Sequence, residues 1–582
     1  MTFQVHSAMK DLSPHRRRYQ ELKSNPSGRL ALSGDDQTWW ELDPERFELE
    51  LTYLAEIGPV ERLPDEEERL VLKLEVEPDG SLPLTVRFPR AYPFLPPDVS
   101  GPIGTTERHQ NPFSGRFCIT DDQPHWWTPD KRAALVVQEV LSLIAASEAG
   151  NVADREAAMP EPITGYLLAG DKTAVVFDAM LEQSLASTEG TFDVLPLSPN
   201  AFTVDGIDGI CAEPLRTPNR VCTAFGVARS NRQRGRHTWR ALDEPPRPRD
   251  LVELCANAFE ELKLRSQPHQ QRSGRGRRNK TGLQLWTART FLEEGPRRGE
   301  QRRAWVFFLA ILKKDGSIDE EHIVSSQAFS KSARDLRVPE LTALSDCWAL
   351  VVGAGALGAP AVGELAKAGV GHIDVVDPDR FDLNNSVRHV LSVSAAGEFK
   401  ASAVAAWAKS RNPYSEVRGH CLAVGDDDNE IRDLVDAADV VIDATGLHHV
   451  TRLLHRQCAN SDVPLVSAGL SLGGYGGRVV ILRDPKPCID CFLADESIPR
   501  PEEENPKEGV TPYGCSHPAA SCAGFDAMEL ASNVARAAVR ATSITRYPSL
   551  DFDWAVVNFR PSGKRWEQGL LEPFDQCPWC AK

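Results

Sequence analysis

The sequence lacks long apolar runs, which argues against a membrane-spanning protein. Its 582 residues contain no stretch of about 18 consecutive apolar residues, the length that a transmembrane helix requires. The N-terminal residues 1–6 also lack the charged and then apolar pattern of a secretory signal peptide. We therefore expect a cytoplasmic protein with no membrane partner.

Dense cysteine spacing and an excess of positive charge are also missing. The 13 cysteines are spread along the chain, unlike those of a small disulfide-rich domain. In a reducing compartment we expect thiols, metal ligands or nucleophiles rather than disulfides. The 66 Lys and Arg are outnumbered by 83 Asp and Glu, and the net charge of −17 would repel polyanions. No nucleic-acid partner is therefore expected.

One basic tract departs from this acidic average. It contains Arg272, Arg275, Arg277, Arg278, Lys280, Arg297, Arg298, Arg302 and Arg303, with Gly, Ser and Gln interspersed. The composition predicts a mobile, solvated linker, and the alternative is a docking site for an acidic partner.

The chain is too long for one hydrophobic core, so several domains are expected. Residues 13–150 contain a polar helix over 13–23 and strand patterns over 70–76 and 82–88. An amphipathic helix follows over 133–146. This combination predicts an α+β domain.

Residues 151–335 have no catalytic constellation, although their patterns indicate folded material. Strand-like runs occur at 173–177 and 305–312, and a helix is predicted over 251–264. We expect an α/β spacer domain that positions its neighbours.

Residues 336–582 alternate strands and helices, which is typical of a doubly wound parallel sheet of the Rossmann type. The first strand is predicted over 348–352, its helix over 359–369 and the second strand over 373–377. A later strand, 440–443, ends in an acidic residue at the sheet edge where such folds place their sites.

A glycine fingerprint joins the first strand to its helix. Gly353, Gly355 and Gly358 have the Gly-x-Gly-x-x-Gly spacing, and Asp377 follows 19 residues after the last of them. Such glycines let backbone N–H groups approach phosphate, and the acid can bind ribose hydroxyls. A nicotinamide-dependent dehydrogenase is the simple alternative.

The segment from Asp377 to Arg388 reads Asp-Pro-Asp-Arg-Phe-Asp-Leu-Asn-Asn-Ser-Val-Arg. It resembles the signature of the ThiF/MoeB/ubiquitin-activating superfamily, whose members adenylate the C-terminal carboxylate of a ubiquitin-like protein. The resemblance implies ATP and Mg²⁺ as cofactors and Arg388 as a catalytic cation. The implied nucleotide-binding residues are Gly353, Gly355, Gly358, Asp377, Asp379, Asn385, Arg388, Lys400 and Asp443.

The sequence departs from this family after the later strand. Members usually carry Asp-x-x-Asp-Asn there, with the second acid serving Mg²⁺, whereas this chain has Asp443 followed by Gly446 at the second position. Either Asp443 holds Mg²⁺ instead, or the metal is held mostly by ATP.

Two Cys-x-x-Cys pairs, Cys488 with Cys491 and Cys577 with Cys580, predict a structural zinc site. Four thiolates from two such pairs suit tetrahedral Zn²⁺, and a redox pair is the lesser alternative. The same arrangement occurs in the ThiF/MoeB family.

The polar stretch 494–514 is rich in Pro and Glu and resembles the crossover loop of that family. Cys515 follows it in a Gly-Cys-Ser-His context and is the favoured nucleophile of the activating domain. Cys522 is the alternative, because the N-terminus of the following helix could lower its pKa. Direct transfer from the adenylate to Cys118 is the third possibility.

Residues 88–129 resemble the core of a ubiquitin-conjugating enzyme. The motifs are Tyr-Pro-Phe-Leu-Pro-Pro at 92–97, His-Gln-Asn-Pro at 109–112, Cys118, and Trp-Trp-Thr-Pro at 126–129. The resemblance implies that Cys118 accepts a thioester and that Asn111 stabilises the oxyanion. The family's His-Pro-Asn tripeptide is altered here, and a small buried thiol is the alternative role for Cys118.

The order of domains is similar to the fused proteins of bacterial antiphage operons, including the CBASS type. The expected domains are 13–150 (conjugating-like), 151–335 (spacer) and 336–582 (adenylation). The resemblance implies conjugation of a modifier or target C-terminus to an acceptor amine, a homodimer, and in some members a cyclic-nucleotide synthase as partner. The rivals are a sulfur-carrier enzyme for cofactor or natural-product biosynthesis and a non-enzymatic scaffold.

Overall fold

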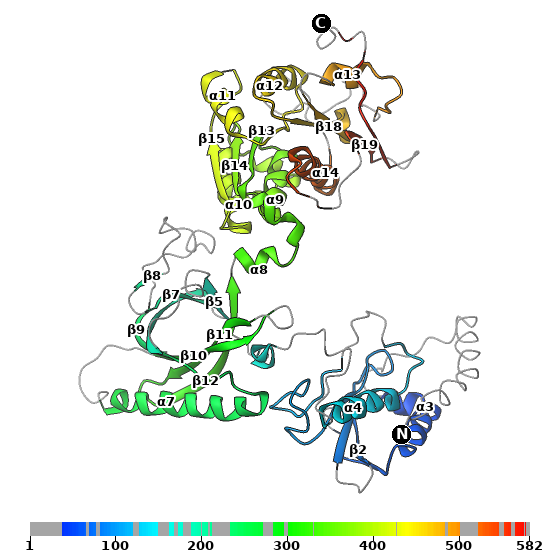
Figure 1. Cartoon of the computed structure of the whole chain (residues 1–582), viewed down its shortest axis with the longest axis vertical. Coiled ribbons are helices and arrows are strands. Elements are labelled where there is room, and N and C mark those ends of the chain that lie inside the picture. Colours follow the sequence, from blue (N-terminus) through cyan, green and yellow to red (C-terminus); the bar gives the residue numbers. More distant parts are fainter. Residues whose placement is uncertain are drawn as a thin grey trace. The chain divides into compact units, whose positions relative to one another are not determined.

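A computed structural model of the chain contains two compact units (Figure 1). The first comprises Met1–Val176, Met180–Ala212 and Arg232–Gln327, and the second Phe177–Ala179, Glu213–Asn231 and Ala328–Lys582. The described residues are 38–65, 69–76, 82–119, 127–148, 162–167, 173–177, 188–198, 201–207, 210–211, 233–271, 283–295, 301–329, 331–425, 428–483, 487–500, 522–545, 547, 552–559, 565–574 and 577. Within them, no helix combines the length and apolar character needed to cross a bilayer.

The first unit begins with helices, a four-stranded antiparallel meander and a further helix. The elements are α2 (Trp39–Leu42), α3 (Pro44–Ala55), β1 (Val60–Arg62), β2 (Leu70–Val76), β3 (Leu82–Phe88), β4 (Asp98–Ser100) and α4 (Ala133–Glu148). Alternate residues of β2 and β3 are buried with one face of α4, as their periodicity predicts. The predicted strands 70–76 and 82–88 and the predicted helix 133–146 are therefore confirmed, whereas 13–23 lies outside the described residues.

A fully buried carboxylate, Glu50 of α3, connects this layer. It accepts hydrogen bonds from the Tyr92 hydroxyl at 2.5 Å and from the backbone N–H of Ala133 at 2.9 Å. The Arg132 guanidinium donates to it at 3.2 Å, and Arg46 lies 3.5 Å away. One side chain therefore holds α3, the loop after β3 and the N-terminus of α4 together.

A second sheet of the first unit closes on itself. Its strands are β5 (Thr173–Phe177), β6 (Glu189–Ser198), β7 (Ala201–Ile207), β8 (Ile210–Cys211), β9 (Gln233–Ala241), β10 (Leu283–Glu294), β11 (Gln301–Leu312) and β12 (Ile318–Phe329). The order is β5-β12-β11-β10-β9-β6-β7-β8, and a further β5–β7 pairing joins the first strand to the seventh. Seven strands thus form a barrel, with β8 as a short hairpin partner of β7.

The expected α/β spacer is therefore strand-dominated, although its predicted elements are present. The strands at 173–177 and 305–312 are found, and the helix at 251–264 extends as α7 (Leu251–Gln271). The parallel neighbours β9 and β10 are joined through α7, whereas β10, β11 and β12 follow one another as antiparallel hairpins. Inward residues of β10 and β11 fill the barrel, and their outward residues pack under α7. The basic tract, which was expected to be a mobile linker, is partly a strand, because Arg302 lies in β11 and pairs with Glu293 at 2.8 Å. Residues 272–280 and 297–298 of the tract lie outside the described residues.

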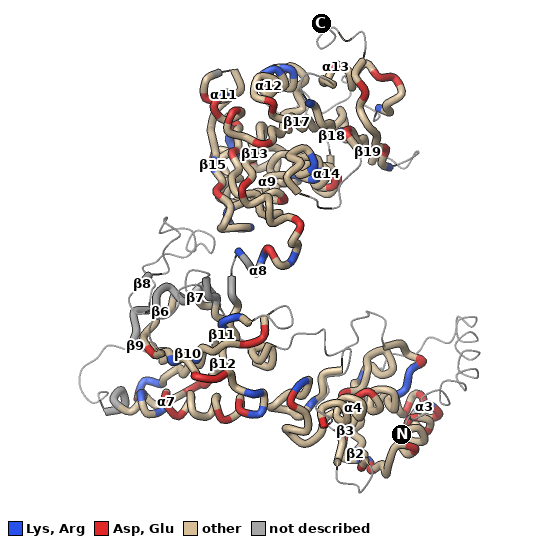
Figure 2. Tube along the Cα trace, viewed as in Figure 1, with Lys and Arg blue, Asp and Glu red and all other residues tan. Residues whose placement is uncertain are grey.

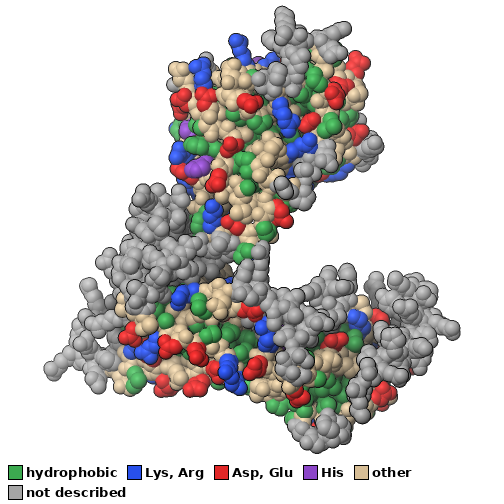
Figure 3. All heavy atoms as spheres, viewed as in Figure 1, with side chains coloured by type: hydrophobic (Ala, Val, Ile, Leu, Met, Phe, Trp, Pro, Cys, Tyr) green, Lys and Arg blue, Asp and Glu red, His purple; other side chains and the backbone are tan. Residues whose placement is uncertain are grey.

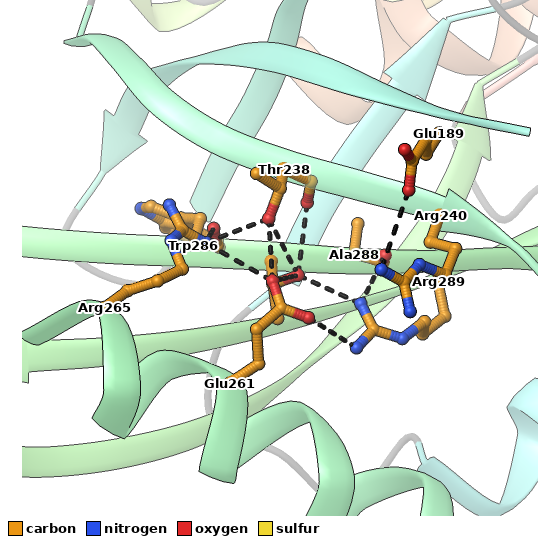
Figure 4. Close-up of polar contacts among 9 residues, drawn as sticks. Glu189, Thr238, Arg240, Glu261, Arg265, Trp286, Ala288 and Arg289 are labelled. Carbon is orange, nitrogen blue, oxygen red and sulfur yellow. Dashed lines mark hydrogen bonds and ion pairs between the residues drawn. The ribbon is translucent and has the colours of Figure 1, made fainter. Parts of the chain in front are cut away.

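Polar contacts fasten α7 to the outside of this barrel (Figure 4). Glu261 of α7 accepts hydrogen bonds from Arg289 at 2.8 Å, Thr238 at 2.9 Å and Thr287 at 3.1 Å. Arg265, one helical turn later, donates to the Thr238 hydroxyl at 2.9 Å. Along α7 the acidic residues Glu253, Glu260 and Glu261 are followed by the basic residues Lys263 and Arg265 (Figure 2), and hydrophobic side chains are scattered on the face seen in Figure 3.

The second unit is a doubly wound sheet, as predicted. Its strands are β13 (Trp348–Val352), β14 (His372–Val376), β15 (Glu416–His420), β16 (Val440–Asp443), β17 (Leu465–Leu470), β18 (Gly476–Leu482), β19 (Trp554–Asn558) and β20 (Trp566–Gly569). The order is β15-β14-β13-β16-β17-β18-β19-β20, parallel from β15 to β17 and antiparallel beyond. Strand order reverses direction at β13, so a crevice is expected at the carboxyl ends of β13, β14 and β16.

Helices cover both faces of this sheet. They are α9 (Gly358–Ala368), α10 (Lys400–Arg411) and α14 (Gly524–Thr542) on one face, and α11 (Asp428–Ala437) and α12 (His448–Ser461) on the other. The central strands are buried on both sides, which explains their continuous Val, Ile and Leu runs.

Glu50→Ala should destabilise the first unit by about 3–5 kcal/mol, because it leaves buried or half-buried cations without their carboxylate. Unfolding followed by tryptophan fluorescence in urea measures the change. Glu75→Ala is the control, since the Lys73–Glu75 pair at 2.9 Å is solvent-exposed and its loss should not move the transition. Equal midpoints for Glu50→Ala and wild type would contradict the assigned role.

Candidate functional site

The turn between β13 and α9 is tight because two of its glycines admit no side chain. A Cβ atom at Gly358 would lie 1.8 Å from the carbonyl oxygen of Gly353. Gly353 has φ +93°, and a Cβ atom there would lie 3.0 Å from the backbone of Ala444. A Cβ atom at Gly355 would meet nothing within 4 Å. The N-terminus of α9 therefore opens onto free space, which suits the phosphates of a nucleotide.

Asp377 follows β14 and holds this turn. Its buried carboxylate accepts hydrogen bonds from the backbone N–H of Ala354 at 2.7 Å and of Asp379 at 2.9 Å, one on each oxygen. Each oxygen keeps a second lone pair, so the same group can also accept from a ribose hydroxyl. Asp377, which was predicted to bind the nucleotide, therefore also holds the glycine turn in place.

His389 also contacts the glycine turn, and sequence reasoning missed it. Its Nε2 lies 2.7 Å from the carbonyl oxygen of Ala354, and its Nδ1 accepts from the Leu391 N–H at 3.1 Å. Burial lowers the pKa of His389, so the ring is neutral and Nε2–H is the donor. The available signal was its position directly after Arg388.

The predicted cations are brought to the same region. Arg388 donates to the side-chain oxygen of Asn385 at 3.2 Å, and the Lys400 ammonium lies 2.8 Å from the exposed carboxylate of Asp379. Burial is the largest cause of the lowered pKa of His389, and the positive charges of Lys400 and Arg388 lower it further. Both cations therefore lie near the turn. A phosphate chain at the N-terminus of α9 would be within their field.

Asp443, the expected Mg²⁺ ligand, is engaged in local structure. Its fully buried carboxylate accepts hydrogen bonds from Thr445 N–H at 3.0 Å, Thr445 Oγ1 at 2.6 Å and Thr451 Oγ1 at 2.5 Å. Burial raises the pKa of Asp443, while these hydrogen bonds and the charge of Arg478 act to lower it. These contacts favour the alternative in which the metal is held mostly by ATP.

Three of the four predicted zinc ligands lie together. The buried Sγ atoms of Cys488, Cys491 and Cys577 lie within 4.8 Å of one another, whereas Cys580 lies outside the described residues. The Cys488 Sγ is 3.5 Å from that of Cys577 and 3.9 Å from that of Cys491. Thiolates at about 2.3 Å from a tetrahedral Zn²⁺ would be about 3.8 Å apart, so this donor set fits zinc.

Of the two candidate relay thiols, the structure describes Cys522. Cys515 lies outside the described residues. Cys522 is only 9% exposed and packs in the core beside α9 and α14, just before the N-terminus of α14. Burial raises the pKa of Cys522, so the lowering expected from the helix N-terminus does not prevail.

Cys118 of the first unit is exposed, which removes the alternative of a buried structural thiol. Its backbone N–H donates to the carbonyl oxygen of His109 at 2.7 Å. Gly115, in the same loop, has φ +67°, and a Cβ atom there would lie 2.3 Å from the carbonyl oxygen of Gly101. The loop that carries Cys118 is therefore closely packed.

Gln110, another residue that sequence reasoning missed, organises this loop. Its buried side chain donates to the carbonyl oxygens of Pro102 at 2.8 Å and Gly115 at 3.2 Å. Its oxygen accepts from the N–H groups of Gly104 at 3.0 Å and Thr106 at 3.3 Å. The signal was a polar residue in the place where the family has proline.

Asn111 faces its own turn through its side-chain oxygen. That oxygen accepts from the N–H groups of Phe113 at 2.9 Å and Ser114 at 3.0 Å. An amide fixed in this way presents Nδ2 as a donor, which is the atom that an oxyanion requires.

Comparison with known proteins gives a consistent result. Residues 329–565 match the ThiF family. Over 94% of this chain and 98% of its own length, the uncharacterized protein y4oA of Sinorhizobium fredii (strain NBRC 101917 / NGR234) is 26% identical. "Adenylyltransferase and sulfurtransferase MOCS3" of Mus musculus is 35% identical, covering 32% of this chain and 40% of its own length.

Among solved structures, Escherichia coli MccB with MccA-N7isoASN covers 42% of this chain and 70% of its own, with 16% identity and a TM-score of 0.34. The family match spans the glycine turn, Asp377, Arg388 and Lys400. The C-terminal part of the chain is therefore a ThiF/MoeB-family adenylation domain.

Proposed function

We propose that this chain activates the C-terminus of a ubiquitin-like or target protein and joins it to an acceptor amine. The observation that carries the proposal is the exposed Cys118, held in a loop fixed by Gln110, in the same chain as an adenylation domain. The helix–meander–helix layer around it supports a conjugating-enzyme role for residues 13–150. Residues 151–335 would then position it relative to the adenylation domain of 336–582.

The first step would be adenylation. A carboxylate oxygen of the protein terminus attacks the α-phosphorus of ATP, the bond to the bridging oxygen breaks, and pyrophosphate leaves. Arg388 and Lys400 would offset the charge that develops on the phosphate oxygens. Mg²⁺ carried by ATP would share this task.

The second stage would be acyl transfer. A cysteine thiolate attacks the acyl carbon, AMP leaves, and a thioester forms. A later thioester exchange places the acyl group on Cys118, where an amine attacks, loses a proton and releases the thiol as an amide forms. Asn111 Nδ2 would donate to the oxyanion of this last step.

Three routes to Cys118 remain within the proposal. Cys515 as the first nucleophile is favoured, because the burial and raised pKa of Cys522 oppose its attack. Direct transfer from the adenylate is the third route. The resemblance to antiphage proteins adds a homodimer, a bacterial defence role and a cyclic-nucleotide synthase as a partner to what we propose.

A second candidate function is activation of a sulfur carrier. It is favoured by the name of the mouse relative, which is both an adenylyltransferase and a sulfurtransferase. That relative covers only 32% of this chain, so its name does not explain the loop of Cys118. The two functions share the adenylate and differ in the need for Cys118.

Arg388→Ala should slow ATP–pyrophosphate exchange with the cognate acyl partner by about 30- to 1,000-fold, equivalent to about 2–4 kcal/mol of lost phosphate stabilisation. Arg380→Ala is the matched control, because Arg380 donates to the Gly397 carbonyl at 2.7 Å and stacks on Phe399. Exchange that is unchanged in Arg388→Ala would remove Arg388 from the site.

Cys118→Ala should abolish amide-linked conjugates while thioester on the adenylation domain persists, as seen on gels with and without dithiothreitol. Cys118→Ser should trap an ester that resists dithiothreitol, because a hydroxyl replaces the thiol. Cys421→Ala is the control, since that thiol is also exposed. Full conjugation by Cys118→Ala would end the conjugating role of Cys118.

We also propose that Cys488, Cys491, Cys577 and Cys580 hold a structural Zn²⁺. Cys488→Ser should lose about one zinc per chain in elemental analysis and lower the thermal stability of the second unit, because thiolate ligation couples to folding. Cys421→Ser should keep its zinc. Elemental analysis that finds no zinc in wild-type protein purified under reducing conditions would refute this site.

A further inference from the structure

Arg478 of β18 lies at the edge of the nucleotide site, and the family signature does not include it. It pairs in register with Gly469 of β17, just past the carboxyl end of β16. A Cβ atom at Gly469 would lie 3.3 Å from Arg478 Nη1 and 3.7 Å from the Cα atom of Gly446. The guanidinium therefore lies over Gly469 and beside Gly446.

His448, the first residue of α12, orients this guanidinium. Arg478 Nη2 lies 2.7 Å from His448 Nε2. Burial, followed by the charge of Arg478, lowers the pKa of His448. A neutral ring can accept the hydrogen bond, so His448 directs the arginine without neutralising its charge.

The glycine turn reaches the same place from the other side. A Cβ atom at Gly353 would lie 3.1 Å from the backbone nitrogen of Thr445, the residue before Gly446. The backbone of the glycine turn therefore packs directly against the segment that leads into Gly446. Arg388 and Lys400 follow β14, so they approach the turn from its opposite side.

The charge at this edge favours an anion. Asp443 is fully buried and already accepts three hydrogen bonds, and Gly446 has no side chain to offer as a metal ligand. The half-buried guanidinium of Arg478 and Gly446, the position of the family's second acid, both lie against Gly469. A guanidinium can bind two phosphate oxygens at once.

We propose that Arg478, positioned by His448, binds the phosphate chain of the nucleotide at the glycine turn. Its charge would do part of the work that a protein-bound Mg²⁺ does in sites with a second acid. The inference rests on the proposed use of ATP and adds a phosphate contact from the α12 side of the crevice.

Isothermal titration of the full-length protein with ATP tests this contact, in Mg²⁺ and in EDTA. Arg478→Gln should weaken ATP binding about tenfold or more, with the larger loss in EDTA, and Arg478→Lys should lose less. AMP binding should change less than about threefold, since AMP lacks the β- and γ-phosphates. Arg483→Gln is the matched control, because Arg483 follows the far end of β18 and pairs with Asp553 at 3.1 Å.

The outcomes separate this contact from the proposed function. Arg478→Gln protein that melts like wild type yet binds ATP equally well overturns the inference. Equal losses for ATP and AMP overturn it too, because they indicate a distorted site. If wild type binds no ATP, the adenylation function itself fails. Loss in Arg388→Ala with no change in Arg478→Gln rejects only the role of Arg478.

Discussion

The close approach of α9 to the end of β13 is the constraint on which the second unit depends. The carbonyl oxygen of Gly353 occupies the space that a Cβ atom of Gly358 would need. Because Gly358 has no Cβ atom, α9 can begin directly at the end of β13. Asp377 then fastens the turn to the end of β14 through Ala354, and His389 fastens it to the signature segment. Because protein groups alone make these contacts, they orient the N–H groups of the helix terminus toward the place where a phosphate would bind.

Buried polar side chains perform the corresponding task elsewhere in the molecule. Glu50 joins three elements of the N-terminal α+β layer, Gln110 shapes the loop of Cys118, and Glu261 ties α7 to the barrel. Each has its hydrogen-bonding capacity largely used by protein groups, so each specifies one arrangement rather than several. Asp443 belongs to this group as well, which is why it suits a structural role better than metal ligation.

The two functional centres therefore differ in design. The adenylation site is built from backbone N–H groups and cations around an open helix terminus, which suits a highly charged substrate. The loop of Cys118 carries an exposed thiol on a scaffold held by amide hydrogen bonds, which is the arrangement that the proposed acyl transfer would use. In the function that we propose, a chain with both would use the cleavage of ATP to AMP and pyrophosphate to drive amide formation.

The sequence by itself determined the elements whose signal is local. Periodicity located β2, β3 and α4, and the Gly-x-Gly-x-x-Gly spacing located the turn before α9, because a strand and a helix each repeat at their own short period. Closure of the barrel came only with the tertiary structure, since pairing β5 with both β12 and β7 joins residues far apart in the chain. The same holds for His389, Gln110 and the Arg478–His448 pair, and for the burial that sets the pKa of Cys522: these depend on which side chains long-range packing brings together, and no local pattern encodes that.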